Sequence, residues 1–297
     1  MSARESHPTP RALPHWRRQP SLAIAAVAAA FAAACAAPSP DGEAVAASAA
    51  AAHTAPDTAT SAHGALRRVP THFAHDPEAP LTAGFLIVDG VYNSELMAPY
   101  DVLHHTPFHT EPAPGVAVFT VSPDGGPVTT FEGLVIDAHH GFDDHPPIDI
   151  LVVPSAEGSM TTDLENSAMI EWVRRTGAQA RFVVSLCDGA FVLAAAGLLD
   201  GRAVTTFPGD QDRFAERFPQ LDLRRGVSFV HDGPAITSEG GAKSYDPAMY
   251  LVDHLYGEAV ARGVGGGLLI DWPPREPDRL PLVIAVTAGE GAATATD

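Results

Sequence analysis

The sequence contains few cysteines and few basic side chains, and both shortages narrow what the chain can be. Its only cysteines are Cys35 and Cys187, so a framework of several disulfides cannot hold the fold together. Lysine and arginine total 18 against 36 aspartates and glutamates, which gives a formal net charge of −18. Such an acidic chain repels phosphate backbones, and no basic stripe or helix-turn-helix pattern is evident in the sequence. We therefore expect no nucleic-acid partner.

The longest apolar stretch near the start, Leu22–Ala34, falls short of the roughly 20 residues that a membrane-spanning helix needs. It follows an arginine-bearing start, an order typical of a secretory signal peptide. The stretch ends in Ala32-Ala33-Ala34-Cys35, which resembles the lipobox of bacterial lipoproteins, although leucine is usual where Ala32 stands. We expect an exported, periplasmic or cell-envelope lipoprotein with its lipid on Cys35. The alternative is a plain signal peptide cut after an Ala-x-Ala site.

Composition divides the rest of the chain into three segments. Residues 36–80 are dominated by Ala, Pro, Ser, Thr and His, and cannot bury enough apolar surface to offset the entropy of ordering. We interpret them as a disordered tether. Residues 81–274 should form one folded domain, and 275–297 a tail whose apolar run, Leu282–Val286, has no place that the sequence reveals.

The folded domain is organised around Cys187. The β-branched and aromatic run Arg181–Leu186 precedes it, and the apolar run Ala190–Leu199, too long for a strand, follows it. The pattern predicts a buried strand that meets a buried helix at the cysteine. Ser185 and Gly189 are small, as a strained strand-to-helix elbow requires if neighbouring side chains are not to collide.

Such an elbow would present the Cys187 sulfur to solvent at the open N-terminus of a helix. Unpaired N–H groups and the helix dipole favour a thiolate there, so we expect a nucleophile more reactive than an ordinary thiol. The other interpretation is a buried structural cysteine, which is a common fate for this residue. The local pattern leaves both interpretations open.

Strands and helices alternate along the domain, which predicts a mostly parallel sheet covered on both faces, with reactive groups at the C-terminal strand ends. The first helix should start just before Glu95, at the same end of the sheet as the elbow. Thr162–Glu165 has the spacing of a capping box, and we expect it to open a helix that Gly177 closes. A last helix should span about Ser244–Ala261, with His254 on its exposed side. The expected strands are Gly84–Val88, Val116–Val121, Gly126–Thr130, Leu134–Ala138, Ile148–Val153, Ala203–Thr206, Val227–His231 and Ala235–Thr237.

Three segments, Glu95–Leu103, Ser185–Leu199 and Thr237–Ser244, carry a family resemblance. Through them the chain from about Gly84 to Trp272 resembles the ThiJ/PfpI family, also called class I glutamine amidotransferase-like. Within that family it is most similar to the isonitrile hydratases and to the amino-terminal sensor domains of AraC-type regulators. The resemblance implies a flavodoxin-like α/β sandwich with a mostly parallel sheet and a cysteine nucleophile elbow.

The resemblance also implies roles for individual residues. Cys187 would lie against Glu95, which could share a proton with the sulfur or act as its base. Backbone N–H groups of Ala156 and Asp188 would be the oxyanion donors by position. The chain departs from the family in two places. Phe207 stands where protease-like members have a histidine, and Asp188 stands where isonitrile hydratases have a threonine, so Asp188 would either oppose thiolate formation or carry a proton.

From this we expect a cysteine-dependent hydratase or hydrolase that acts on a small electrophilic carbon compound through Cys187, Glu95 and Asp188. Two alternatives stay open: a ligand-sensing or interaction domain without catalysis, and a protective protein whose cysteine oxidises reversibly. The expected partners are a small-molecule ligand and, through Cys35, a membrane, with a homodimer left open and no cofactor. Six histidines match no metal-ligand spacing, so we expect no metal site; they are His104, His105, His109, His139, His140 and His145.

Overall fold

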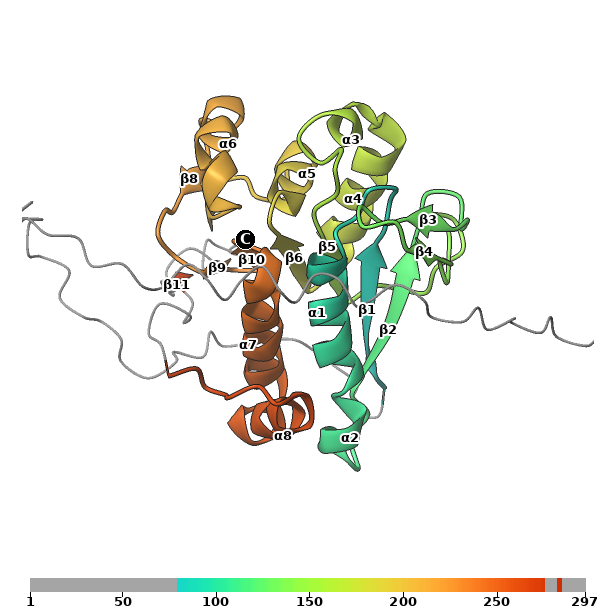
Figure 1. Cartoon of the computed structure of the whole chain (residues 1–297), viewed down its shortest axis with the longest axis vertical. Helices are drawn as coiled ribbons and strands as arrows, with labels where there is room; N and C mark the ends of the chain where they lie inside the picture. Colours follow the sequence, from blue (N-terminus) through green and yellow to red (C-terminus); the bar gives the residue numbers. More distant parts are fainter. Residues whose placement is uncertain (1–78, 276–281, 285–297) are drawn as a thin grey trace, which may run out of the picture. The chain divides into compact units, whose positions relative to one another are not determined.

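The structure of the chain is a computed structural model that describes residues 79–275 and 282–284 (Figure 1). The expected signal peptide with Cys35, nearly all of the tether and most of the tail lie outside the described residues. Within the described ranges, no helix is both long enough and apolar enough to cross a membrane.

A seven-stranded sheet forms the centre of the described domain, with the strand order β11-β9-β10-β6-β5-β1-β2. The five strands from β10 to β2 are parallel, and β9 pairs antiparallel with β10. Its strands are β1 (Leu81–Leu86), β2 (Val116–Val121), β5 (Ile150–Val153), β6 (Phe182–Leu186), β9 (Phe229–Asp232), β10 (Ala235–Ser238) and β11 (Leu282–Ile284). Two short pairs stand apart from it: β3 (Val128–Thr129) with β4 (Val135–Ile136), and β7 (Ala203–Val204) with β8 (Asp222–Leu223).

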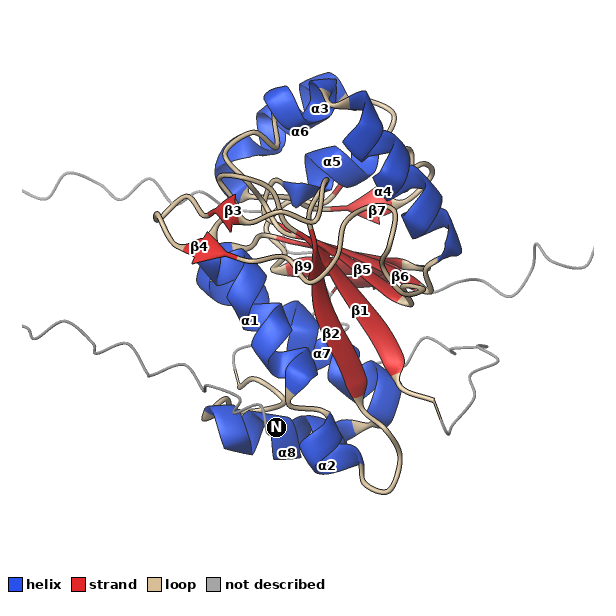
Figure 2. Cartoon of the chain, turned by 90° about the vertical axis from the view of Figure 1, so that its right-hand side faces the viewer, coloured by secondary structure: helices blue, strands red, loops and turns tan. Residues whose placement is uncertain are grey.

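Helices cover both faces of this sheet (Figure 2). One face packs against α1 (Asn93–His104), α7 (Tyr245–Tyr256) and α8 (Glu258–Leu268). The other face packs against α4 (Ser167–Gln179), α5 (Gly189–Ala195) and α6 (Gln211–Arg217). Strand β5 shows why both layers are needed, because Ile150 and Val152 join one buried cluster while Leu151 and Val153 join the other. The remaining short segments are α2 (Pro107–Thr110), α3 (Thr162–Glu165), η1 (Pro208–Asp210) and η2 (Gly241–Ser244).

This architecture confirms the expected flavodoxin-like α/β class, but the capping-box prediction is wrong. Thr162–Glu165 forms the separate short helix α3, and the long helix α4 begins at Ser167. Asn166 caps it, since its side-chain oxygen accepts a hydrogen bond from the Met169 amide at 3.1 Å. Gly177 does not end the helix; a Cβ there would lie 2.3 Å from a Leu198 methyl, so the glycine allows close packing.

The last predicted helix is also corrected. Gly257, with φ of +89°, divides it into α7 and α8. His254 is buried rather than exposed, and its ring lies edge-on to Phe182 and His231. The tail run, which the sequence could not place, supplies β11 beside β9.

Candidate functional site

The elbow predicted at Cys187 is present where β6 runs into α5. Cys187 has φ of +53°, a left-handed conformation that non-glycine residues rarely adopt. A Cβ on Gly189 would lie 2.0 Å from the carbonyl oxygen of Val153, so this position accepts only glycine without backbone movement. Gly240 is constrained in the same way, because its Cβ would lie 2.4 Å from the Cys187 Cβ. Two glycines therefore allow neighbouring backbone segments to pack closely around Cys187.

Glu95, in the first turn of α1, reaches the same place. Its side chain is only 5% exposed, and Oε1 accepts a hydrogen bond from the Gly241 amide at 3.0 Å. The Cys187 thiol also interacts with this carboxyl, whose Oε2 is buried and has no other partner among the described residues. Burial raises the pKa of Glu95, and the nearby charge of Glu132 raises it further.

Asp188 supplies a second carboxyl that contacts the sulfur. Its Oδ2 accepts a hydrogen bond from the Cys187 thiol, with 3.8 Å between sulfur and oxygen. Its Oδ1 accepts a hydrogen bond from the Thr206 hydroxyl at 3.3 Å. Burial, followed by the charge of Asp210, raises the pKa of Asp188 to about 7. This carboxyl therefore gains and loses its proton near neutral pH.

These surroundings decide the state of the thiol. Cys187 is 8% exposed, and burial, then the charges of Asp188 and Glu95, raise its pKa well above the ordinary value for a cysteine. The Asp188 amide and the Ser155 hydroxyl favour the thiolate to a smaller degree. The expectation of a solvent-facing thiolate is therefore wrong, because desolvation and two carboxylates outweigh the helix terminus. The site holds a neutral thiol between two protonatable carboxyls.

Two further expectations concern the residues around the sulfur. The Ala156 amide donates to the Ser159 hydroxyl oxygen at 2.8 Å, so it is not a free oxyanion donor, and that assignment is corrected. The Asp188 amide acts on the sulfur itself. Phe207 is 43% exposed, and no imidazole is among the described groups that shift the pKa of the thiol. A Cys-His-acid triad is thus not formed by these residues.

Sequence reasoning missed Tyr92, which immediately precedes α1. Burial raises the pKa of its hydroxyl, as do the charges of Cys187, Glu95, Glu157 and Asp188, so this side chain lies beside the site. The signal that could have found it is position, because Tyr92 belongs to the same strand-to-helix junction as Glu95.

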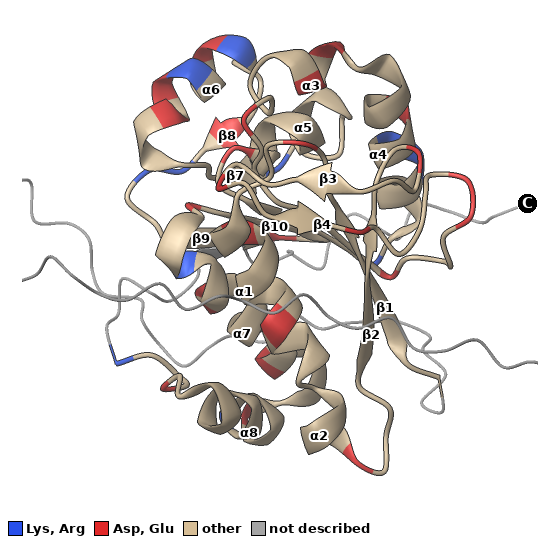
Figure 3. Ribbon diagram, turned by 45° about the vertical axis from the view of Figure 1, so that its right-hand side comes forward, with Lys and Arg blue, Asp and Glu red and all other residues tan. Residues whose placement is uncertain are grey.

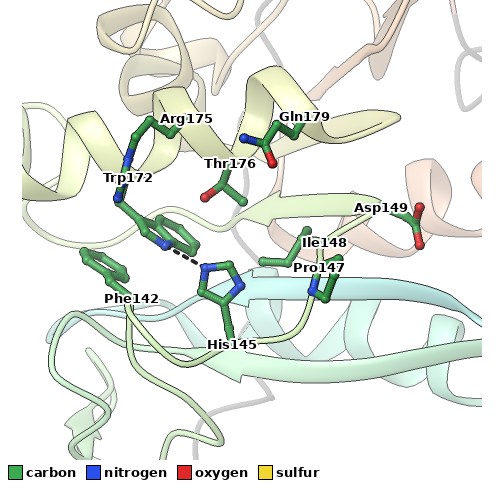
Figure 4. Close-up of a pocket in the computed structure, with 9 residues that line it drawn as sticks. All are labelled: Phe142, His145, Pro147, Ile148, Asp149, Trp172, Arg175, Thr176 and Gln179. Carbon is green, nitrogen blue, oxygen red and sulfur yellow. Dashed lines mark hydrogen bonds between the residues drawn. The ribbon is translucent and has the colours of Figure 1, made fainter.

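A groove of about 330 Å³ lies at the other end of the sheet, and none of the predicted site residues lines it (Figure 4). It is formed between α4 and the segment that leads into β5. The Trp172 indole N–H donates to His145 Nε2 at 3.0 Å, and the indole ring stacks on the Phe142 ring. The lining residues are Phe142, His145, Pro147, Ile148, Asp149, Trp172, Arg175, Thr176 and Gln179. Over the described ranges, no three His, Cys, Asp or Glu side chains gather as a metal site would require.

The fold and the site together define a class of protein: a flavodoxin-like α/β domain with a cysteine at a strand-to-helix elbow and an acidic side chain from the first strand-helix junction. The model of the DJ-1/PfpI family matches residues 82–253. The chain belongs to the DJ-1/PfpI family.

Relatives within this family differ in function. An isonitrile hydratase from Pseudomonas putida is 33% identical over 197 residues, which cover 66% of this chain and 81% of the relative. The HTH-type transcriptional regulator CdhR from Pseudomonas aeruginosa is 33% identical over 141 residues, 48% of this chain and only 41% of the regulator. The crystal structure of a ThiJ/PfpI family protein from Pseudomonas syringae matches with a TM-score of 0.57 at 23% identity, covering 68% of this chain and 78% of that one, which bears on the fold alone.

Proposed function

We propose that this protein is a cysteine-dependent hydratase that adds water to a small electrophilic carbon compound, with an isonitrile as the leading substrate class. The observation that carries the proposal is the neutral Cys187 thiol held between the carboxyls of Glu95 and Asp188. Hydration of an isonitrile begins with a proton delivered to carbon, and a site rich in exchangeable protons suits that step. The similarity to the Pseudomonas putida isonitrile hydratase supports the same reaction.

The reaction R–NC + H₂O → R–NH–CHO can proceed in three balanced steps. First, the Cys187 proton passes to the isonitrile carbon, directly or through Asp188, while the sulfur bonds to that carbon and forms R–N=CH–S–Cys. Second, water adds across the C=N bond, with its hydroxyl on carbon and a proton on nitrogen. Third, the C–S bond breaks as the hydroxyl proton returns to sulfur, with Glu95 or Asp188 as carrier, and the formamide leaves. A thiol of raised pKa suits this cycle, because the sulfur must take its proton back.

A substrate panel tests the proposal. Isonitriles, nitriles and small dicarbonyls are offered to the wild type, Cys187→Ala and Glu95→Gln, and product is followed by chromatography, with circular dichroism confirming that each variant is folded. Each change should lower kcat/KM for isonitriles by about a hundredfold or more, the usual scale of acid–base and nucleophilic assistance. Arg174→Gln, an exposed change on α4, is the control that should leave the rate unchanged.

One pattern would reject the hydratase. If all forms give the same background rate while a ligand still raises the melting temperature of Cys187→Ala, the domain binds without catalysis, as a ligand sensor would. The regulator relatives keep that alternative in view.

We further propose export and a lipid anchor on Cys35, because the apolar run before it ends in a lipobox-like sequence. The full chain should then partition into detergent, and Cys35→Ser should release it to the aqueous phase. A mature N-terminus at another residue, found by mass spectrometry, would reject the anchor.

A further inference from the structure

The short hairpin formed by β3 and β4 is tied to the junction that carries Tyr92 and Glu95. The Phe131 amide donates to the carbonyl of Val91 at 3.0 Å. On the opposite side of this junction, the Tyr92 amide donates to the carbonyl of Ser155 at 3.0 Å, next to the Cys187 sulfur. The junction is thus held between the hairpin and the sulfur-bearing site.

The hairpin presents an aromatic surface at this point. The Phe131 ring lies 4.6 Å from the Tyr92 ring, centre to centre, yet 54% of Phe131 is exposed. A second exposed aromatic residue, Phe207, directly follows Thr206, whose hydroxyl donates to Asp188. Exposed aromatic side chains beside a reactive group are suited to receive an apolar part of a ligand.

The charged groups that shift the pKa values of Tyr92, Glu95 and Asp188 are all negative. Glu132 acts on Glu95, Asp210 acts on Asp188 and Glu157 acts on Tyr92, and each raises the pKa of its neighbour. Glu132 is fixed there, because its carboxylate accepts a hydrogen bond from the first amide of α1, on Asn93, at 3.1 Å.

Basic side chains do not balance these acids. The hairpin strands β3 and β4 carry no lysine or arginine, whereas α4 and α6 do (Figure 3). Lys243, in η2, is paired with Glu239 at 2.7 Å. A carboxylate or phosphate on the substrate would therefore meet repulsion near the sulfur.

We infer that the β3–β4 hairpin selects the substrate: the Tyr92–Phe131 pair receives an apolar substituent on the reacting carbon compound, and the acidic rim of Glu132, Glu157 and Asp210 rejects anionic compounds. The substrate class is then an uncharged isonitrile with an aromatic or bulky alkyl group. The inference rests on the proposed function, and it assigns to the hairpin a role in choosing the substrate rather than in the chemistry.

Binding of reaction products tests the inference without turnover. Calorimetric titrations compare N-benzylformamide, N-methylformamide and N-formylglycine on the full chain. The wild type should bind the benzyl compound about tenfold more tightly than the methyl compound, the scale of modest apolar discrimination in a pocket. Phe131→Ala should remove most of this ratio. Val135→Ala, a change at another exposed apolar residue of the same hairpin, should keep it.

The charge is tested with N-formylglycine. We expect wild type to bind it several-fold more weakly than the methyl compound, and Glu157→Gln to reduce the difference, in a manner that added salt reproduces. Equal affinities for all three compounds, no binding of any of them, or equal effects of Phe131→Ala and Val135→Ala would overturn the inference.

Turnover separates this inference from the proposed function. The kcat/KM ratio of benzyl isonitrile to isocyanoacetate should follow the binding ratio. If no isonitrile is hydrated but the binding preference and its loss in Phe131→Ala are observed, the hydratase is rejected and the selecting surface stands. If isonitriles are hydrated with no preference, the hydratase stands and the selecting surface is rejected.

Discussion

The two ends of strands β5 and β6 treat polar groups in opposite ways. At the end where the strands begin, Asp149 pairs with Arg181 at 2.8 Å and accepts two hydrogen bonds from Thr82. His145, beside it, uses both ring nitrogens, one donating to the Pro146 carbonyl and the other accepting from an indole. At this end Asp149 is paired with an opposite charge, and both ring nitrogens of His145 have hydrogen-bond partners.

At the end where the strands finish, several buried polar groups lack hydrogen-bond partners among the described residues. The hydroxyls of Ser155 and Ser185 and one oxygen of Glu95 are buried without a hydrogen bond of ordinary geometry. Two groups of the same charge sign, Glu95 and Asp188, both act on the Cys187 thiol and raise its pKa. Burial without counter-charges raises the pKa of both carboxyls. In the proposed reaction these groups exchange protons with the substrate, which they could not do if the fold occupied them fully. One end of these strands stabilises the domain, and the other carries the proposed active site.

The largest expected effect comes from adding a methyl group at each end. Gly189→Ala would place its Cβ 2.0 Å from the Val153 carbonyl oxygen, which is backbone and cannot turn away. We expect a loss of about 3 kcal/mol or more in the free energy of unfolding. Gly177→Ala meets only side chains, chiefly the Leu198 methyls, which can change rotamer, and Val183 at 3.2 Å. Alanine also favours the helix, so the net cost should be about 1 kcal/mol or less. Urea unfolding measures both, and equal costs would contradict this account of the elbow.

Much of this comparison could be predicted from the sequence, because the signals are local. The apolar runs on either side of Cys187, with Gly189 after it, gave the elbow and its place at the strand ends. The alternation of strands and helices predicted the parallel sheet and brought Glu95 to the same edge. Each of these conclusions needs only residues that are neighbours along the chain.

The sequence-based expectations were wrong where the outcome depends on contacts between residues far apart in the chain. Glu132 binds the first amide of α1 from 39 residues away, a contact that no local pattern reveals. The protonation state of Cys187 depends on how deeply the fold buries it and on which carboxyls it gathers there, and the helix-terminus argument contained neither quantity. Likewise, the burial of His254 follows from the packing of α7 against β6 and β9, which its position along the helix does not reveal.

A second prediction removes one carboxylate at each end. The folded pKa of Asp188, about 7, lies above its unfolded value of about 4, so the stability linked to its proton is fully present only below about pH 4 and is lost progressively as the pH rises to about 7. Asp188→Asn should therefore raise the free energy of unfolding by about 1–2 kcal/mol near pH 8, and by less near pH 5, where only part of that stability has been lost. Asp149→Asn should lower it by about 1 kcal/mol at both pH values, because it weakens a pair with Arg181. Urea unfolding at the two pH values measures both effects. If Asp188→Asn is less stable than the wild type near pH 8, the raised pKa assigned to Asp188 is wrong.

The smallest expected effect is on thiol reactivity, which tests directly how the two carboxyls act on the sulfur. Only the thiolate is alkylated, so the wild type should react with iodoacetamide more slowly near pH 8 than a free cysteine, whose pKa is about 8.5. Asp188→Asn and Glu95→Gln each remove a charge that raises the pKa of Cys187, and each should speed alkylation about three- to tenfold. Neither variant should reach the rate of the free thiol, since burial is the largest cause of the shift and stays in place. Glu171→Gln, on the exposed face of α4, should change nothing. Mass spectrometry of the modified peptide gives the rates; a wild type as fast as free cysteine would show that the carboxyls do not hold the sulfur neutral, and that the thiolate expected at a helix terminus forms after all.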